Sequence, residues 1–184
     1  MKEKILQLIS EAKQGLSVQD LSEKLNVQGS AQYTKLIRLL NHMEDNLAIA
    51  RDERDRYHLA EELGYFQGVL RVNPKGFGFI DLDDISYYVA KENLHLGMDQ
   101  DVVAARILKD TARSTECEVV RILEHHNKRF VGVVKKDRDH FYFLSDKDLA
   151  GRRISVSNYD EFPLVHDSKV LVEIDSYGRE LRGH

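Results

Sequence analysis

The chain has 184 residues, of which 42% are hydrophobic and 8% aromatic, and this composition predicts globular domains and excludes a disordered tail. Its 27 Lys and Arg residues against 31 Asp and Glu residues give a formal net charge of -4, so any nucleic-acid site must be local. The lone Cys117 excludes an internal disulfide and a multi-cysteine metal cage, and we expect it to be a small buried hydrophobe. The first residues lack the apolar run of a signal peptide or membrane span, which predicts a cytoplasmic protein.

Residues 1–64 show helical spacing followed by two short strand patterns. Ser17, with Asp20 three residues later, forms a capping box that predicts the start of a second helix, and Ser30 is expected to cap a third, longer one. The segments "LAIAR" and "RYHLA" flank a polar stretch and predict two strands with a loop, so this part of the chain predicts a winged helix-turn-helix. The polar residues of the third helix that would contact a partner are Gln32, Lys35 and Arg38.

A winged helix often reads duplex DNA through its third helix. Residues 1–64, however, hold nine Lys and Arg residues against eleven Asp and Glu residues, and the loop "RDERDR" alternates the two signs. This charge balance favours a module that positions the chain or binds a protein partner. Recognition of duplex nucleic acid is the alternative.

From about residue 64 the pattern changes to short β runs, and five of them predict a small barrel that includes a polar connection at 109–116. Gly68, Phe77 and Phe79 have counterparts 64 positions later, which predicts a second barrel. After its fourth matched strand only "DSYGRELRGH" remains, so we expect that barrel to lack its fifth strand and the chain to come from a longer one. The predicted fold is α+β and multidomain, with a winged helix-turn-helix at 1–64 and five-stranded barrels at 65–126 and 127–184, the second truncated.

The stretch "PKGFGFI" predicts an exposed aromatic surface. Alternate side chains of a strand share a face, so Lys75, Phe77 and Phe79 face one way, and the following isoleucine and two glycines face the other. This pattern favours an inward isoleucine and outward rings on which nucleobases stack, with lysine near a phosphate and glycines that permit close approach. Tyr88 would extend this surface, and Arg71 would lie near a phosphate or over a base. The alternative is that both phenylalanines are ordinary core residues.

The string "KGFGFI" followed by "YYVA" resembles the paired RNA-binding motifs of cold-shock domains, which are five-stranded OB barrels. The resemblance implies RNA-binding roles for Lys75, Phe77, Phe79 and Tyr88. The chain departs from the cold-shock pattern near Val72, where a further aromatic is usual, and at Ala90, where histidine is usual. Two stacking positions are therefore lost, and the affinity of this barrel alone should be modest.

The second copy of the motif, "DHFYFL", is degenerate. Asp139 takes the lysine position, and His140 and Tyr142 take the glycine positions, where their bulk would obstruct close backbone approach. A possible second RNA-binding set consists of Phe141, Phe143, Lys135 and Lys136. The neighbouring basic residues Arg138, Arg152 and Arg153 would contact phosphates or, in the alternative, are solvated loop residues.

The order of winged helix, cold-shock barrel and degenerate cold-shock barrel resembles the N-terminal region of the ribonuclease R group in the ribonuclease II family. The similarity covers the whole chain, and "GVLRVNPKGFGFIDLDD" is among its most specific pieces. The resemblance implies a 3′-to-5′ exoribonuclease, a hydrolase of RNA degradation, with Mg²⁺ held in a catalytic domain that this chain lacks. No catalytic residue, metal ligand or cofactor is expected here, since Asp81, Asp83 and Asp84 are interpreted as a solvated turn.

Two functions follow from these observations. In the first, the chain binds single-stranded or structured RNA and guides it toward the absent catalytic domain, without cleaving it. In the second, the chain is a DNA-binding transcriptional regulator that uses its winged helix, with the barrels as accessories.

Overall fold

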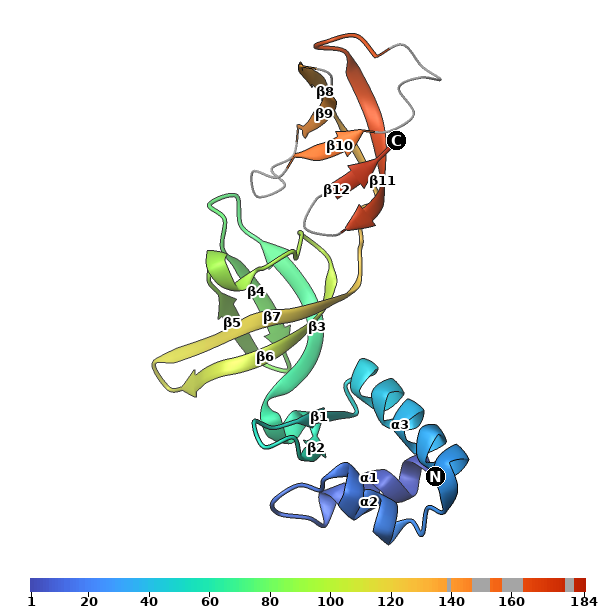
Figure 1. Cartoon of the computed structure of the whole chain (residues 1–184). Helices are drawn as coiled ribbons and strands as arrows, with labels where there is room; N and C mark the ends of the chain where they lie inside the picture. Colours follow the sequence, from blue (N-terminus) through green and yellow to red (C-terminus); the bar gives the residue numbers. More distant parts are fainter. Residues whose placement is uncertain (139, 147–152, 157–163, 178–180) are drawn as a thin grey trace.

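A computed structural model describes residues 1–138, 140–146, 153–156, 164–177 and 181–184. Along the chain, three helices precede a two-stranded sheet and two five-stranded barrels, which Figure 1 shows as successive bodies from blue to red. The structure is therefore mixed, with its helices gathered at the start, as the expected α+β class requires.

The helices at the start of the chain bury one apolar stripe each. They are α1 (Lys2–Ser10), α2 (Val18–Lys24) and α3 (Gly29–Asp45). Ile5 and Ile9, four apart on α1, and Leu36 and Leu40, four apart on α3, are fully or almost fully buried together with Leu21 of α2. Their period places them on one side of each helix, so the three stripes meet in a common core.

The caps of α2 and α3 differ from each other. The Ser17 hydroxyl accepts from the Asp20 backbone N–H at 3.1 Å, and the Asp20 carboxylate accepts from the Ser17 N–H at 2.9 Å, which confirms the predicted capping box. The expectation that Ser30 caps α3 is wrong, because the N-cap is Gln28 and Ser30 already lies in the first turn. The chain turns into α3 through Gly29, whose φ of +76° is a left-handed conformation that glycine adopts without strain.

Two short strands, β1 (Ile49–Arg51) and β2 (Tyr57–Leu59), form the expected antiparallel pair after α3. The loop between them is held by Asp52, whose carboxylate accepts from the backbone N–H groups of Arg54 and Arg56. A short 3-10 helix, η1 (Ala60–Leu63), then leads through Gly64 directly into the first barrel.

The first barrel closes in the order β3-β4-β5-β7-β6, with β5 parallel to β7 and the other neighbours antiparallel. Its strands are β3 (Tyr65–Val72), β4 (Gly78–Leu82), β5 (Ile85–Val89), β6 (Val102–Thr111) and β7 (Ser114–Glu124). A 3-10 turn, η2 (Lys91–Asn93), follows β5. Inward side chains such as Leu70, Ile80, Tyr87 and Val103 fill its core, and Cys117 is buried among them, as expected.

The segment 109–116 is not the polar connection that we expected. β6 and β7 continue through it as one long hairpin, with Lys109 opposite Glu116 and Thr111 opposite Ser114. This ribbon extends beyond the body of the barrel (Figure 1), and its side chains at 109–116 are mostly polar and either exposed or half-buried. Polar composition therefore concealed a strand pair, because the alternation of apolar and polar residues disappears where neither face is buried.

The second barrel has the same connectivity as the first, in the order β10-β12-β11-β8-β9 with β10 parallel to β12. Its strands are β8 (Arg129–Asp137), β9 (His140–Ser145), β10 (Ile154–Val156), β11 (Lys169–Tyr177) and β12 (Leu181–Gly183). The expectation of a missing fifth strand is wrong, since β12 closes the barrel. β12 takes the place of β7 but is only three residues long, against eleven for β7, so it was not recognised as a strand in the sequence.

Asp101 joins the two barrels. Its carboxylate has no exposed surface and accepts hydrogen bonds from the backbone N–H groups of Met98 at 2.9 Å and His126 at 3.1 Å, and it lies 3.0 Å from Nδ1 of His125. Met98, in the turn before β6, packs into the core of the second barrel beside Phe130. A buried carboxylate is thus matched by donors from both sides of the junction, as buried charge requires.

We expect Asp101→Ala to lower the free energy of unfolding by about 2–3 kcal/mol, because it leaves buried backbone donors without an acceptor. Urea denaturation followed by circular dichroism measures this change. Asp84→Ala, at an exposed position, is the matched control and should alter stability by less than about 0.5 kcal/mol. Equal stability of the two variants would contradict a joining role for Asp101.

Cys117 should be unreactive in the folded protein. Burial raises the pKa of its thiol to about 12, so at pH 8 almost none of it is the reactive thiolate. Ellman's reagent should label the native chain slowly and the urea-unfolded chain at once. Fast labelling at pH 8 without urea would show that the first barrel opens readily.

Candidate nucleic-acid interface

The interface begins with the orientation of β4. Ile80 has no exposed surface and packs in the core of the first barrel, against residues such as Leu70. Because neighbouring residues of a strand point to opposite faces, Phe79 points outward. Phe77, just before β4, and Tyr88 of β5 lie on the same outer face, with Tyr88 37% exposed and both phenylalanines half-buried. The alternative in which the two phenylalanines fill the core is therefore wrong.

The three rings form one cluster. Their centroids are 5.7 Å apart for Phe77 and Phe79, 5.6 Å for Phe77 and Tyr88, and 5.8 Å for Phe79 and Tyr88. The Phe79 ring stands edge-on to the other two, which is a favourable arrangement for aromatic quadrupoles. Each ring contacts the other two, and we call this cluster the ring platform.

Two lysines border the ring platform. Lys75 is exposed, but it lies in the turn between β3 and β4 and not in the strand where the alternation argument placed it. Within the described part of the chain it makes no ion pair. Lys91 was missed by sequence reasoning, although a Cβ built on Gly76 would lie only 3.3 Å from its Cδ. Lys91 is also exposed and unpaired among the described residues. The only signal for it was its place directly after "YYVA".

The glycines of the motif serve the protein rather than a ligand. Gly76 has φ of +90° and forms the turn that returns the chain to β4. A Cβ on Gly78 would lie 3.1 Å from side-chain atoms of both Leu70 and Leu94, inside the barrel. The expectation that Gly78 lets a ligand approach is therefore wrong, because the missing side chain leaves room for the core beneath the rings.

Arg71 lies beside the ring platform but is engaged. It pairs across the strands with Phe79, and its Nη2 donates to both carboxylate oxygens of Asp81, at 2.9 and 2.7 Å. The pKa of the Asp81 carboxyl is lowered, first by the hydrogen bond that the Ser86 side chain donates to it and then by the hydrogen bond and positive charge of the Arg71 guanidinium. This carboxylate therefore stays charged at neutral pH, and the ion pair is lost only as pH falls through the lowered value.

The four residues proposed as a second site do not share a surface. Phe143 has no exposed surface and fills the core of the second barrel, so its assignment to RNA binding is wrong. Phe141 lies half-buried two residues earlier with the Lys136 ammonium 5.4 Å from its ring centroid. Lys135 makes an ion pair with Asp167.

A shorter hairpin explains this error. In the first barrel Leu70 pairs with Ile80, and in the second Val134 pairs with Phe143, so the offset is 64 on one strand and 63 on the next. One residue fewer in the turn moves every following side chain to the other face. Phe143 therefore takes the inward place of Ile80, and Tyr142 takes the outward place of Phe79.

The third helix has a different surface. Lys35 and Arg38 are exposed on α3, and the Gln32 side chain accepts from the Gln28 backbone N–H at 3.0 Å. Three basic residues near the β1–β2 loop are paired with acids: Arg51 with Glu44 and Asp55, Arg56 with Asp20, and His58 with Asp52. Arg54 is exposed and makes no ion pair among the described residues, so this loop offers a phosphate backbone one cation between acidic neighbours.

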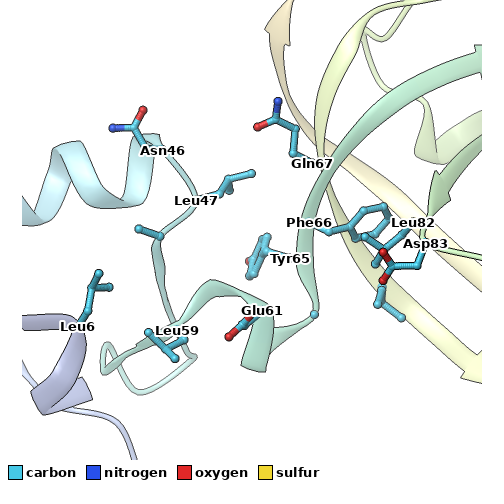
Figure 2. A pocket seen from close by; sticks show the side chains of 13 residues that line it. Leu6, Asn46, Leu47, Leu59, Glu61, Tyr65, Phe66, Gln67, Leu82 and Asp83 are labelled. Atoms are coloured by element: carbon cyan, nitrogen blue, oxygen red, sulfur yellow. The ribbon is translucent and has the colours of Figure 1, made fainter. Parts of the chain in front are cut away.

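A pocket of about 600 Å³ lies where the helical part meets the first barrel. Figure 2 shows Leu47, between α3 and β1, and Tyr65 and Gln67, on β3, in the lining of this pocket. Nearby, the Arg121 guanidinium donates to the Asp45 backbone carbonyl at 2.6 Å and so caps the end of α3. The pocket is mostly the space at the junction of the helical part and the first barrel.

The described residues include no group of three His, Cys, Asp or Glu side chains arranged to hold a metal ion. Asp83 and Asp84 lie in the β4–β5 turn, as expected, whereas Asp81 lies within β4 and pairs with Arg71. These three carboxylates do not fit a Mg²⁺ site. Among the helices described, none is long and apolar enough to cross a bilayer.

Comparison with known proteins places these features in a family context. Residues 68–122 match the Ribonuclease B OB domain. Ribonuclease R of Vibrio parahaemolyticus is 26% identical over 99% of this chain, and ribonuclease R of Ureaplasma parvum is 29% identical over 84%; the aligned part is 22% of each of those proteins. Mycoplasma genitalium RNase R, solved in complex with ribose methylated single-stranded RNA, superposes with a TM-score of 0.55 at 24% identity, over 64% of this chain and 20% of that one.

These matches agree in kind with the resemblance drawn from the ring motif. The chain spans about a fifth of the curated relatives, and the family match falls on the barrel that carries the ring platform. The chain is therefore similar to ribonuclease R proteins over most of its length, and its residues 68–122 match the Ribonuclease B OB domain.

Proposed function

We propose that the chain is the RNA-binding N-terminal region of a ribonuclease R-like 3′-to-5′ exoribonuclease, and that it captures single-stranded RNA and guides it toward a catalytic domain. The observation that carries the proposal is the ring platform, in which Phe77, Phe79 and Tyr88 face outward over a packed core. Bases of any sequence can stack on such rings, and Lys75 and Lys91 lie beside them, where they can bind phosphates. RNA bound to the Mycoplasma relative supports the same ligand class.

We further propose the finer architecture behind this function. Residues 1–64 form a winged helix, and residues 65–126 and 127–184 form tandem cold-shock barrels. Three separate apolar cores, one in each range apart from Met98, support these boundaries. The winged helix has its own exposed face on α3 for a protein partner or duplex nucleic acid.

Cleavage is assigned to a part of the enzyme outside this chain. In this proposal the role of the chain is to hold RNA, which the outward rings of the ring platform support. The Mg²⁺ of the proposed parent activity belongs to that other part, and a cytoplasmic location fits its substrate.

Phe79→Ala should weaken the binding of an unstructured oligouridylate by about 1–3 kcal/mol, since one stacking surface is lost. Fluorescence polarisation measures the dissociation constant. Phe77→Ala should give a loss of the same order. Tyr33→Ala is the matched control, because it removes an aromatic ring that is 45% exposed on α3, away from the ring platform, and should leave affinity unchanged. Unchanged affinity in both phenylalanine variants would reject the site.

The competing function, a regulator that reads duplex DNA, makes a different prediction. It requires tighter binding to a duplex than to a single strand and a steep salt dependence. The paired arginines near the β1–β2 loop disfavour it. We expect the single strand to bind more tightly and to retain binding at higher salt, as measured by parallel titrations of both nucleic acids.

Asp81→Asn should tighten RNA binding, because it removes a negative charge beside the ring platform and releases Arg71. The slope of log affinity against log salt should steepen by about 0.7 if Arg71 then contacts one phosphate. Asp84→Asn changes the net charge equally but frees no arginine among the described residues, so its slope should stay at the wild-type value. Identical slopes in the two variants would show that Arg71 makes no phosphate contact.

A further inference from the structure

The outer faces of the two barrels correspond row by row. In the first barrel, cross-strand pairing sets Arg71 opposite Phe79, Phe79 opposite Tyr88 and Tyr88 opposite Glu116. In the second barrel the corresponding strands, β8, β9, β10 and β12, pair to give one row across the outer face: Lys135, Tyr142, Ser155 and Arg182. Each row thus contains a cation, an aromatic ring, a third residue and a terminal charge.

The terminal charge has the opposite sign in the two barrels. Glu116 ends the first row, with Lys109 as its ion-pair partner at 3.2 Å. Arg182 ends the second row, is exposed, and has no ion pair within the described ranges. The second outer face is therefore the more basic one, although its ring motif is the more degenerate.

Tyr142 is the centre of this second face. Its ring is half-buried and carries the Arg153 guanidinium, whose Cζ lies 4.7 Å from the ring centroid. Arg153 is exposed, and among the residues that the structure describes it has no carboxylate partner. A guanidinium held on an aromatic face keeps its N–H edges free for phosphate. Arg152, the other arginine named from the sequence, lies outside the described residues.

We propose that Tyr142, Arg153 and Arg182 form a second RNA-binding surface on the outer face of the second barrel, which takes the phosphates of a single strand that extends beyond the ring platform. The proposal rests on the proposed function of the first barrel. It replaces the predicted set around Phe143, which is buried, and it differs from the ring platform in kind. With one ring and two arginines that have no ion pair among the described residues, this surface binds mainly through phosphate, so its affinity depends on salt more than that of the ring platform.

Strand length separates the two surfaces in an experiment. An oligouridylate of about five nucleotides fits one barrel, whereas one of about twenty nucleotides is long enough to reach both. Fluorescence polarisation should show that the double variant Arg153→Gln/Arg182→Gln binds the longer probe roughly tenfold more weakly and binds the shorter probe with unchanged affinity. For the longer probe, the slope of log affinity against log salt should become shallower by about 1.4 in this variant, because two phosphate contacts are lost.

Two further variants test the ring. Tyr142→Leu keeps a bulky side chain but loses the aromatic face, so it should bind the longer probe about fivefold more weakly than the wild type. Tyr142→Phe should bind it as the wild type does. The matched control is Arg106→Gln/Arg129→Gln, which removes the same charge from two arginines paired with Glu118 and Glu173. Thermal melting checks that each variant is folded.

The outcomes distinguish the two proposals. If the arginine and tyrosine variants bind the longer probe as tightly as the wild type, or lose no more affinity than the control, the second surface is rejected. A loss of affinity in Phe79→Ala would then still support the first surface. If Phe79→Ala binds the shorter probe as tightly as the wild type, the proposed function of the first barrel fails. If Arg153→Gln/Arg182→Gln loses more affinity for the longer probe than the control does and keeps its affinity for the shorter probe, the second surface is supported.

Discussion

Burial of Ile80 is the constraint on which the candidate site depends. Its side chain is sealed in the first barrel, and the period of a strand then forces Phe79 to the other side. Gly78 adds to this constraint, since only a residue without Cβ leaves space for Leu70 and Leu94 beneath. The hydrophobic effect thus orients a surface that is itself exposed: the outward rings are a consequence of what the strand buries on its inner face.

Charge in this molecule is organised locally. Some cations of this chain, whose net charge is -4, are matched by carboxylates, such as Arg71 by Asp81 and Arg106 by Glu118. Others make no ion pair among the described residues, and four of these, Lys75, Lys91, Arg153 and Arg182, lie on or beside the outer barrel faces. A polyanion is attracted most strongly where no carboxylate competes, so these four cations favour a site on the barrels.

Much of the fold was predictable where side chains alternate between core and solvent. The capping box at Ser17, the barrel strands and the outward rings all follow from local pattern. The errors arose where pattern carries no such contrast. Residues 109–116 of the β6–β7 hairpin have no fully buried side chain, and β12 is too short for a periodic signal. Phe143 lies on the opposite face from the expected one because the turn before β9 is one residue shorter. Lys91 was missed because contacts made through a turn, here with Gly76, leave no trace in spacing.

Met98 has a consequence for how the barrels fold. This side chain leaves its own barrel and completes the neighbour's core, while Asp101, three residues later, binds the segment that leads into that neighbour. Neither barrel is then self-sufficient: separation exposes a methionine on one side and opens a void on the other. We expect the two barrels to unfold in one cooperative transition. Their relative orientation is then fixed by the packing between them and not by a flexible linker.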